Sequence, residues 1–196
     1  MPMDERAAIN ELSLIQRILS GNRDAYAELV RAHQARTLRV CTALLGDAMS
    51  AEDAAQDTFF KAYQSLASFR GQSAFSTWLY RIAANHCLDL LRKRQRERTE
   101  SWDALIEESG EQLHDLLVAP PDPQTVAANT ELIQRALAHL TPEYRLILTL
   151  REVEGLSYQE LAIALHCSLD AVKARLRRAR QDLLERVRHF LGAGSV

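Results

Sequence analysis

The sequence predicts an all-α protein made of two small helical domains joined by a flexible acidic linker. Apolar residues recur three and four positions apart along most of the 196 residues, and no alternating strand pattern with hairpin turns accompanies them. Residues 97–126 are acidic and contain Pro120, Pro121 and Pro123, which cannot sustain a helix. We therefore expect one domain over residues 1–96, the linker over residues 97–126 and a second domain over residues 127–196.

Four helices are expected in the first domain. Gly21 ends the first helix and Gly46 ends the second, while Ser50 and Asp53 have the spacing of an S-x-x-D cap for the third. Ser73 or Ser76 is the expected start of the fourth. The predicted helices cover residues 11–20, 24–45, 50–66 and, from either serine, to about residue 96.

The second domain is expected to begin with two helices. The first covers about residues 126–140, where the apolar period resumes after the linker. Thr141 and Pro142 stand in the favoured N-cap and N1 order for the next helix, which Gly155 should end.

The C-terminal segment has the pattern of a helix-turn-helix. Ser157 and Glu160 form an S-x-x-E capping box for the first helix, and residues 166–168 form a three-residue turn. Ser168 can cap the second helix. One face of this second helix is cationic, which suits the major groove of DNA. Its opposite, buried face is expected to carry Val172, Leu176 and Ala179.

The net charge of −2 conceals a separation of charge along the chain. Residues 92–98 hold five cations and one acid, and residues 173–188 hold seven cations and two acids. The acidic linker lies between them. Two basic patches in one chain are typical of contact with nucleic acid at two places.

The segment from Phe75 to Arg96 combines an apolar stripe with a polar one. Arg81 and Asn85 lie on the polar stripe, and cations, an amide and nearby aromatic rings suit single-stranded DNA. Trp78 is expected to anchor the core instead. On the preceding helix Asp53, Gln56 and Asp57 share one side, which would suit a protein partner carrying cationic helices, although a solvated charged face explains these residues equally well.

Several classes of protein are excluded or disfavoured. Cys41, Cys87 and Cys167 are far apart and lack metal-ligand spacing, so we expect neither a metal site nor a cofactor. Nothing resembles a signal peptide, and no apolar run reaches the roughly 18 residues of a membrane span. We expect a cytoplasmic protein without membrane insertion. The sequence shows no nucleophile–base pair or phosphate loop, so we do not expect an enzyme.

Taken together, these segments resemble the bacterial extracytoplasmic-function (ECF) sigma factors, the minimal two-domain members of the sigma-70 family. The resemblance covers roughly residues 11–95 and 127–190. It rests on AEDAAQDTF at residues 51–59, FSTWLYRIAAN at residues 75–85 and the C-terminal helix-turn-helix. It implies a factor that directs RNA polymerase to promoters and has no catalytic activity of its own.

The resemblance also implies roles for particular residues. Asp53, Gln56 and Asp57 would bind the clamp helices of the polymerase β′ subunit, and the β flap is a second expected contact. Promoter DNA and an anti-sigma factor are the other expected partners. The residues implied for the −10 element are Arg81, Asn85, Arg92, Lys93 and Arg96. Those implied for the −35 element are Ser168, Lys173, Arg175, Arg177 and Arg178.

Three positions depart from the family pattern near the start of the recognition helix. Many members have Gly-Thr where this chain has Asp170-Ala171, and Ala174 replaces a frequent serine. Asp170 could accept a hydrogen bond from cytosine N4. These departures concern the −35 sequence preference and leave the expected binding mode unchanged.

The main alternative is a stand-alone helix-turn-helix repressor or activator. Such a protein binds operator DNA without polymerase, usually as a dimer with paired half-sites. No dimerisation heptad stands out in this sequence, and the segment at residues 75–96 has no purpose in such a protein. An enzyme with a helical DNA-binding tail is a weaker alternative, because most of the clustered carboxylates lie in the linker.

Overall fold

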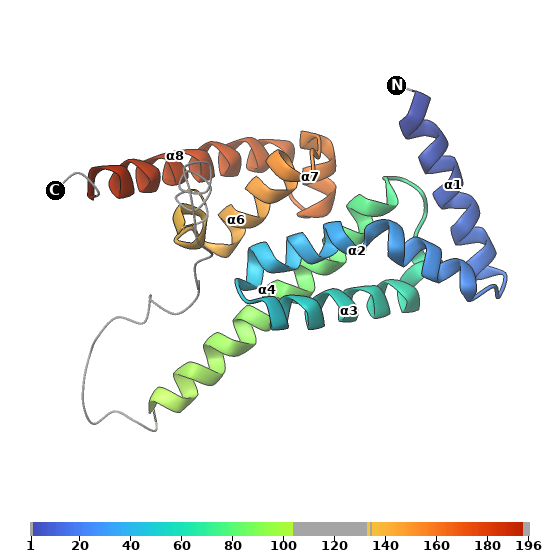
Figure 1. The fold of residues 1–196 in the computed structure, drawn as a ribbon, viewed down its shortest axis with the longest axis horizontal. Helices are drawn as coiled ribbons and strands as arrows, with labels where there is room; N and C mark the ends of the chain where they lie inside the picture. The colour runs from blue at the N-terminus through green and yellow to red at the C-terminus, as the bar shows by residue number, and fades with distance from the viewer. Residues whose placement is uncertain (1, 104–132, 134, 194–196) are drawn as a thin grey trace, which may run out of the picture.

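The computed structural model describes residues 2–103, 133 and 135–193, and these residues form helices and turns without any strand (Figure 1). The all-α prediction is therefore confirmed for this part of the chain. The first half, residues 2–103, contains α1 (Pro2–Leu19), α2 (Asp24–Leu45), α3 (Ala48–Ser65), a 3-10 turn (Leu66–Ser68) and α4 (Phe75–Asp103). The second half, from residue 133, contains α6 (Pro142–Leu148), a π turn (Thr149–Val153), α7 (Tyr158–Ala164) and α8 (Leu169–Ala193).

The predicted helix limits agree with the structure where a local signal is strong. Helix α2 covers the predicted residues, and Gly46 ends it in the left-handed conformation with a φ of 79°. Helix α1 starts earlier than predicted, and α4 continues beyond Arg96 to Asp103. Most of the predicted helix at 126–140 and most of the predicted linker lie outside the described residues, but residues 135–138 are helical.

The predicted cap of α3 was wrong. Asp47 is the N-cap, and its Oδ1 accepts a hydrogen bond from the Ser50 backbone N–H at 2.7 Å. Ser50 therefore lies inside the first turn, where its hydroxyl contacts the Arg94 guanidinium. Both residues favour helix starts, and in the structure it is the Asp47 carboxylate that caps the helix; it also lies 3.5 Å from Arg94.

Helices α2, α3 and α4 pack against one another to form the body of the first half, and α1 packs against α2. Their apolar faces build one cluster around Leu29, Phe75 and Trp78. Trp78 is 6% exposed and contacts the rings of Phe69 and Phe75, so its prediction as a core anchor is confirmed. These aromatic contacts hold the N-terminal end of α4 in place.

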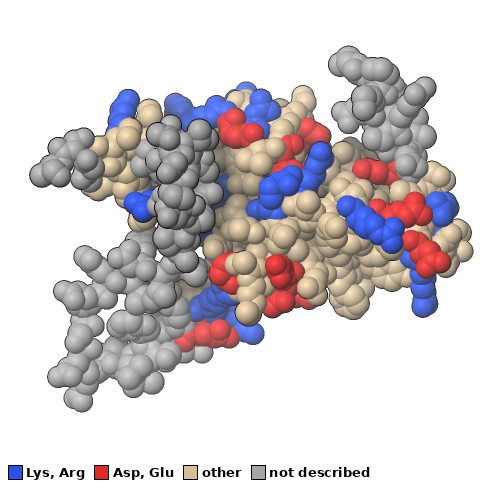
Figure 2. Space-filling model, viewed as in Figure 1, with Lys and Arg blue, Asp and Glu red and all other residues tan. Residues whose placement is uncertain are grey.

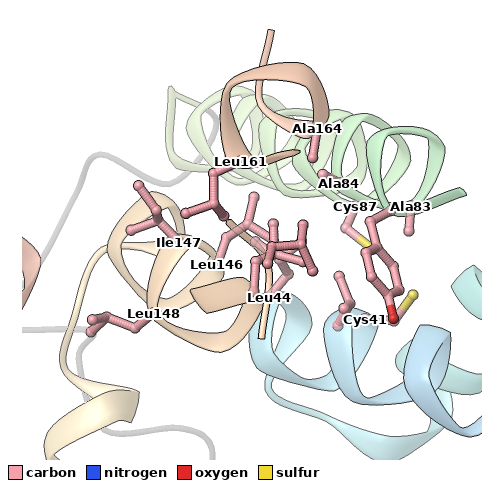
Figure 3. Packing of buried hydrophobic residues seen from close by; sticks show 14 of the residues in the cluster. Cys41, Leu44, Ala83, Ala84, Cys87, Leu146, Ile147, Leu148, Leu161 and Ala164 are labelled. Atoms are coloured by element: carbon pink, nitrogen blue, oxygen red, sulfur yellow. The ribbon is translucent and has the colours of Figure 1, made fainter. Parts of the chain in front are cut away.

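A second cluster of buried apolar residues spans both halves of the chain. Helix α6 packs on α2, and α7 packs on α4, so the two halves lie against each other (Figure 1). Figure 3 shows Leu146 and Leu161 of the second half beside Leu44 of α2, and Ala164 of α7 next to Ala84 of α4. The prediction of two helical domains therefore needs one addition, which is that in this conformation they share a core.

The cap of α3 gives a test that separates the two candidate capping residues. Asp47→Ala should lower the free energy of unfolding by about 1 kcal/mol at pH 7, because a helix N–H loses its acceptor. Ser50→Ala should change it less, and Asp47→Asn should keep most of the cap. Urea unfolding followed by circular dichroism measures all three; an equal loss in the two alanine variants would contradict the assignment.

The same variants carry a pH dependence. The Ser50 backbone N–H, then the Ser50 hydroxyl and Arg94, hold the pKa of the Asp47 carboxyl below its usual value. The stabilisation is therefore present above the unfolded pKa of about 4 and is lost as the pH falls through the lower folded pKa. Asp47→Asn should lack this component of the acid dependence.

Candidate nucleic-acid interface

The helix-turn-helix forms as the sequence predicts. The Ser157 backbone N–H donates to Glu160 Oε2 at 2.8 Å, and the Glu160 backbone N–H donates to Ser157 Oγ at 3.2 Å, which completes the capping box. In the turn, His166 takes a left-handed φ of 49°. Ser168 Oγ then accepts from the Ala171 backbone N–H at 3.2 Å, so α8 begins with the predicted cap.

Helix α8 buries one side and exposes its cations on the other. The predicted buried residues Val172, Leu176 and Ala179 are at most 1% exposed. Lys and Arg side chains lie along α8 on the face shown in Figure 2. Of the residues predicted for the −35 element, Arg175 is half-buried and the other four are exposed. The exposed four are Ser168, Lys173, Arg177 and Arg178.

The cations of α8 differ in their partners. Arg180 donates two hydrogen bonds to Glu152 Oε1, at 2.6 and 3.1 Å, and Lys173 lies 3.3 Å from the Asp170 carboxylate. Arg177 and Arg178 form no ion pair within the described part of the chain. These two guanidinium groups can therefore reach a phosphate or a base edge without breaking an internal pair.

The residues predicted for the −10 element follow α4. Asn85, Arg92, Lys93 and Arg96 are exposed, whereas Arg81 is half-buried. Arg81 lines an open cavity of about 550 Å³ together with Ile163, His166, Cys167 and Ser168 of the helix-turn-helix. The structure therefore brings together Arg81 and Ser168, which the sequence analysis assigned to separate promoter elements.

The acidic side of α3 is exposed, as its pattern predicts. Asp53, Gln56 and Asp57 point to solvent, and Phe60, on the same helix, is 62% exposed. Asp57 Oδ2 lies 3.1 Å from Nε2 of His86 on α4, and the other ring nitrogen of His86 contacts Lys61. This contact of His86 could not be predicted from the sequence, because no local pattern links two residues on different helices.

The three cysteines are free thiols. Cys41 and Cys87 are buried and Cys167 is half-buried. The hydrogen bond between the first two lowers the pKa of Cys41 and, with burial, raises the pKa of Cys87. Among the described residues no group of three or more His, Cys, Asp or Glu side chains could hold a metal ion. No described helix is both long enough and apolar enough to cross a membrane.

A polar cluster that the sequence did not predict lies between the two halves. Glu154 follows the π turn, and its side chain is only 1% exposed. Its carboxylate accepts hydrogen bonds from Arg39 Nε of α2 at 2.9 Å and from the Tyr80 hydroxyl of α4 at 3.0 Å. Arg36 lies 3.9 Å away. Burial, and then the Glu154 charge, raise the pKa of Tyr80.

Comparison with known proteins identifies both halves. The family model of sigma-70 region 2 matches residues 29–97, and that of sigma-70 region 4 matches residues 130–183. The RNA polymerase sigma-H factor of Pseudomonas aeruginosa is 36% identical over 177 residues, covering 87% of this chain and 90% of that protein. The ECF RNA polymerase sigma-E factor of Escherichia coli K12 is 33% identical over 183 residues, covering 91% and 94%.

Two solved structures have a similar fold. One is the sigma factor RpoE of Bartonella quintana in complex with the anti-sigma factor NepR, with a TM-score of 0.67, 28% identity and coverage of 83% of this chain and 96% of that chain. The other is CnrH in complex with the cytosolic domain of CnrY, with a TM-score of 0.61, 26% identity and coverage of 93% and 97%. Both matches extend over the two halves.

Proposed function

The chain belongs to the ECF RNA polymerase sigma factors of the sigma-70 family, and we propose that its two halves read the two elements of a promoter after binding core polymerase. The observation that carries the proposal is the exposed basic face of α8, on which Arg177 and Arg178 form no ion pair among the described residues. A region 4 helix-turn-helix presents this face in the same chain as a region 2 match. Sigma factors confer promoter specificity and have no catalytic activity of their own.

The boundaries proposed for the functional units are those expected from the sequence. Residues 1–96 form the unit that binds polymerase and the −10 element, residues 97–126 the linker, and residues 127–196 the unit that binds the −35 element. The family models support the two outer units, because their matches begin and end on either side of the linker's proline-rich part.

Helix α3 is the proposed contact with the β′ clamp helices. Its carboxylates Asp53 and Asp57 and the amide of Gln56 are exposed, beside the apolar ring of Phe60. Exposed acidic groups around an apolar centre suit a partner with cationic helices. The β flap is the second proposed polymerase contact, through residues 127–196.

The −10 element is the proposed ligand of α4. Asn85 can form hydrogen bonds with the edge of an unstacked base, and Arg81 can stack on a base or form hydrogen bonds with it. The phosphates of the same strand can be bound by Arg92, Lys93 and Arg96. Opening the duplex costs a few kcal/mol per unstacked base, which these contacts would offset. The −35 element would lie as duplex along Ser168, Lys173, Arg175, Arg177 and Arg178.

An anti-sigma factor is the proposed regulator. Support comes from the two similar structures, in which a sigma factor is bound by the anti-sigma factor NepR and CnrH is bound by CnrY. The cytoplasm is the proposed location, because the polymerase and the chromosome are there. Co-purification with core polymerase, followed by runoff transcription on genomic fragments, tests the function as a whole; a chain that neither binds polymerase nor changes its products would refute it.

The α3 contact predicts a charge effect on polymerase affinity. Asp53→Asn keeps the size of the side chain but removes its charge, and should weaken binding to core polymerase about tenfold, or about 1.4 kcal/mol. Competition between labelled wild-type chain and unlabelled variants measures this. Glu28→Gln, which removes an exposed carboxylate from α2, is the matched control and should bind like the wild type. Equal affinity of all three proteins would argue against α3.

The −10 assignment predicts a defect in promoter opening. Asn85→Ala should slow the fluorescence rise of a 2-aminopurine placed in the −10 element by roughly tenfold, because one amide–base contact is worth about 1–3 kcal/mol. Binding to core polymerase should stay unchanged. Gln34→Ala removes an exposed amide from α2 and should open the promoter at the normal rate. A normal rate in Asn85→Ala would remove Asn85 from the proposed site.

The −35 assignment predicts a loss of duplex affinity. Arg178→Ala should lower the affinity of the polymerase complex for a promoter with an intact −35 element about tenfold, and should matter little on a promoter whose −35 element is scrambled. Arg188→Ala is the control, since it removes an exposed cation of α8 beyond the region 4 match. Equal losses on both promoters would indicate a phosphate contact instead of base recognition.

A further inference from the structure

The contact between the two halves has the features of a closed state that must open for function. We propose that Glu154 is a latch that holds the second half of the free chain on α2 and α4, and that releasing it allows the chain to engage a promoter. The second part of this inference rests on the proposed function. The first part concerns only the conformation of the chain and can be tested by itself.

The latch joins three segments through one buried carboxylate. Glu154 accepts hydrogen bonds from Arg39 and Tyr80, which belong to different helices of the first half, while its own backbone belongs to the second half. Burial of an ionised carboxylate is unfavourable unless it is paired and hydrogen-bonded. Removing either donor, or the charge itself, therefore weakens the closed state specifically.

The backbone around Glu154 orients its side chain toward the first half. Across the π turn the Glu154 N–H bonds to the Thr149 carbonyl, and Gly155, with a φ of 76°, reverses the chain at once. The carboxylates of Glu152 and Glu154, two residues apart, therefore pair with arginines in different halves of the chain. Glu152 pairs with Arg180 inside the second half, and Glu154 pairs with Arg39 of the first half.

Two further contacts reinforce the closed state. The Arg145 guanidinium of α6 donates to the Leu44 carbonyl in the last turn of α2, at 3.3 Å. A cation is favourable there, because the final carbonyls of a helix lack internal partners and carry its negative end. Small residues allow the other contact, since Ala84 of α4 and Ala164 of α7 are both buried where these helices meet (Figure 3).

The closed state cannot read both promoter elements. The −10 and −35 elements are about 25 base pairs apart, or roughly 85 Å of duplex at about 3.4 Å per base pair. Arg81 and Ser168, proposed for the two elements, line the same cavity of about 550 Å³. Residues 104–132, fully extended, would span about 100 Å, which is enough for the halves to separate.

Spin labels on the full-length chain measure the closure directly. Met49→Cys on α3 and Leu184→Cys on α8 place labels at two exposed positions, in a Cys167→Ser background that leaves only the buried Cys41 and Cys87. Double electron–electron resonance should give one narrow distance for this parent chain. Glu154→Gln and, separately, Arg39→Gln should transfer a several-fold larger fraction of molecules to longer, broader distances.

Glu152→Gln is the matched control, because it removes a neighbouring carboxylate whose partner lies in its own half. It should keep the parent distance. A broad distribution in the parent chain, or parent-like distances in both Glu154→Gln and Arg39→Gln, would overturn the latch. The Arg39 variant guards against misfolding, since Arg39 is about half exposed on α2.

The unlabelled variants then test the link to promoters. With limiting chain and saturating core polymerase, Glu154→Gln should raise transcription from a cognate promoter several-fold over the wild type. Longer distances without a gain in transcription would show that closure does not compete with promoter binding, and would overturn that part of the inference. If even the wild type directs no transcription while the distances still shift, the proposed function fails and the latch stands.

Discussion

The structure depends on the burial of two very short helices. Helices α6 and α7 have seven residues each, and isolated helices of this length are not stable in water. Each is therefore held by neighbours on two sides, with α8 on one side and α2 or α4 of the first half on the other. Leu146, Leu161 and Ala164 are almost fully buried between these neighbours. Helix α8 and the body of the first half are thus coupled through the same small elements.

The arginines fall into two groups, those that face solvent and those that bind groups within the fold. Arg177 and Arg178 of α8 face solvent without an ion pair among the described residues, whereas Arg39 and Arg145 satisfy groups within the fold. Burial lowers the pKa of Arg145, but an arginine keeps its charge in proteins and can serve in such a position where a lysine would tend to lose its proton. The distribution of charge along the sequence therefore does not show which arginines face solvent and which bind groups within the fold.

Features encoded within about four residues could be predicted from the sequence. The capping box at Ser157, the cap at Ser168 and the buried face of α8 all appear as expected. The cap of α3 could not be assigned correctly, because Asp47 and Ser50 both suit a helix start and no local pattern distinguishes them. The cluster at Glu154 joins residues that are 115 and 74 positions away, and no local pattern reports such a contact. The exposure of the proposed DNA-binding residues agrees with their assignment, while their roles remain predictions.

Helix α3 lies on the side of the first half away from the second half, so closure leaves its outer surface uncovered (Figure 1). If that surface is the docking site for polymerase, the order of assembly follows from geometry. A closed chain would bind polymerase before it binds a promoter. Until then, the residues proposed for the −10 and −35 elements could not engage the large excess of ordinary chromosomal DNA together. Free molecules would then form a diffusing reserve, and the search for promoters would begin only once an enzyme able to use them is attached.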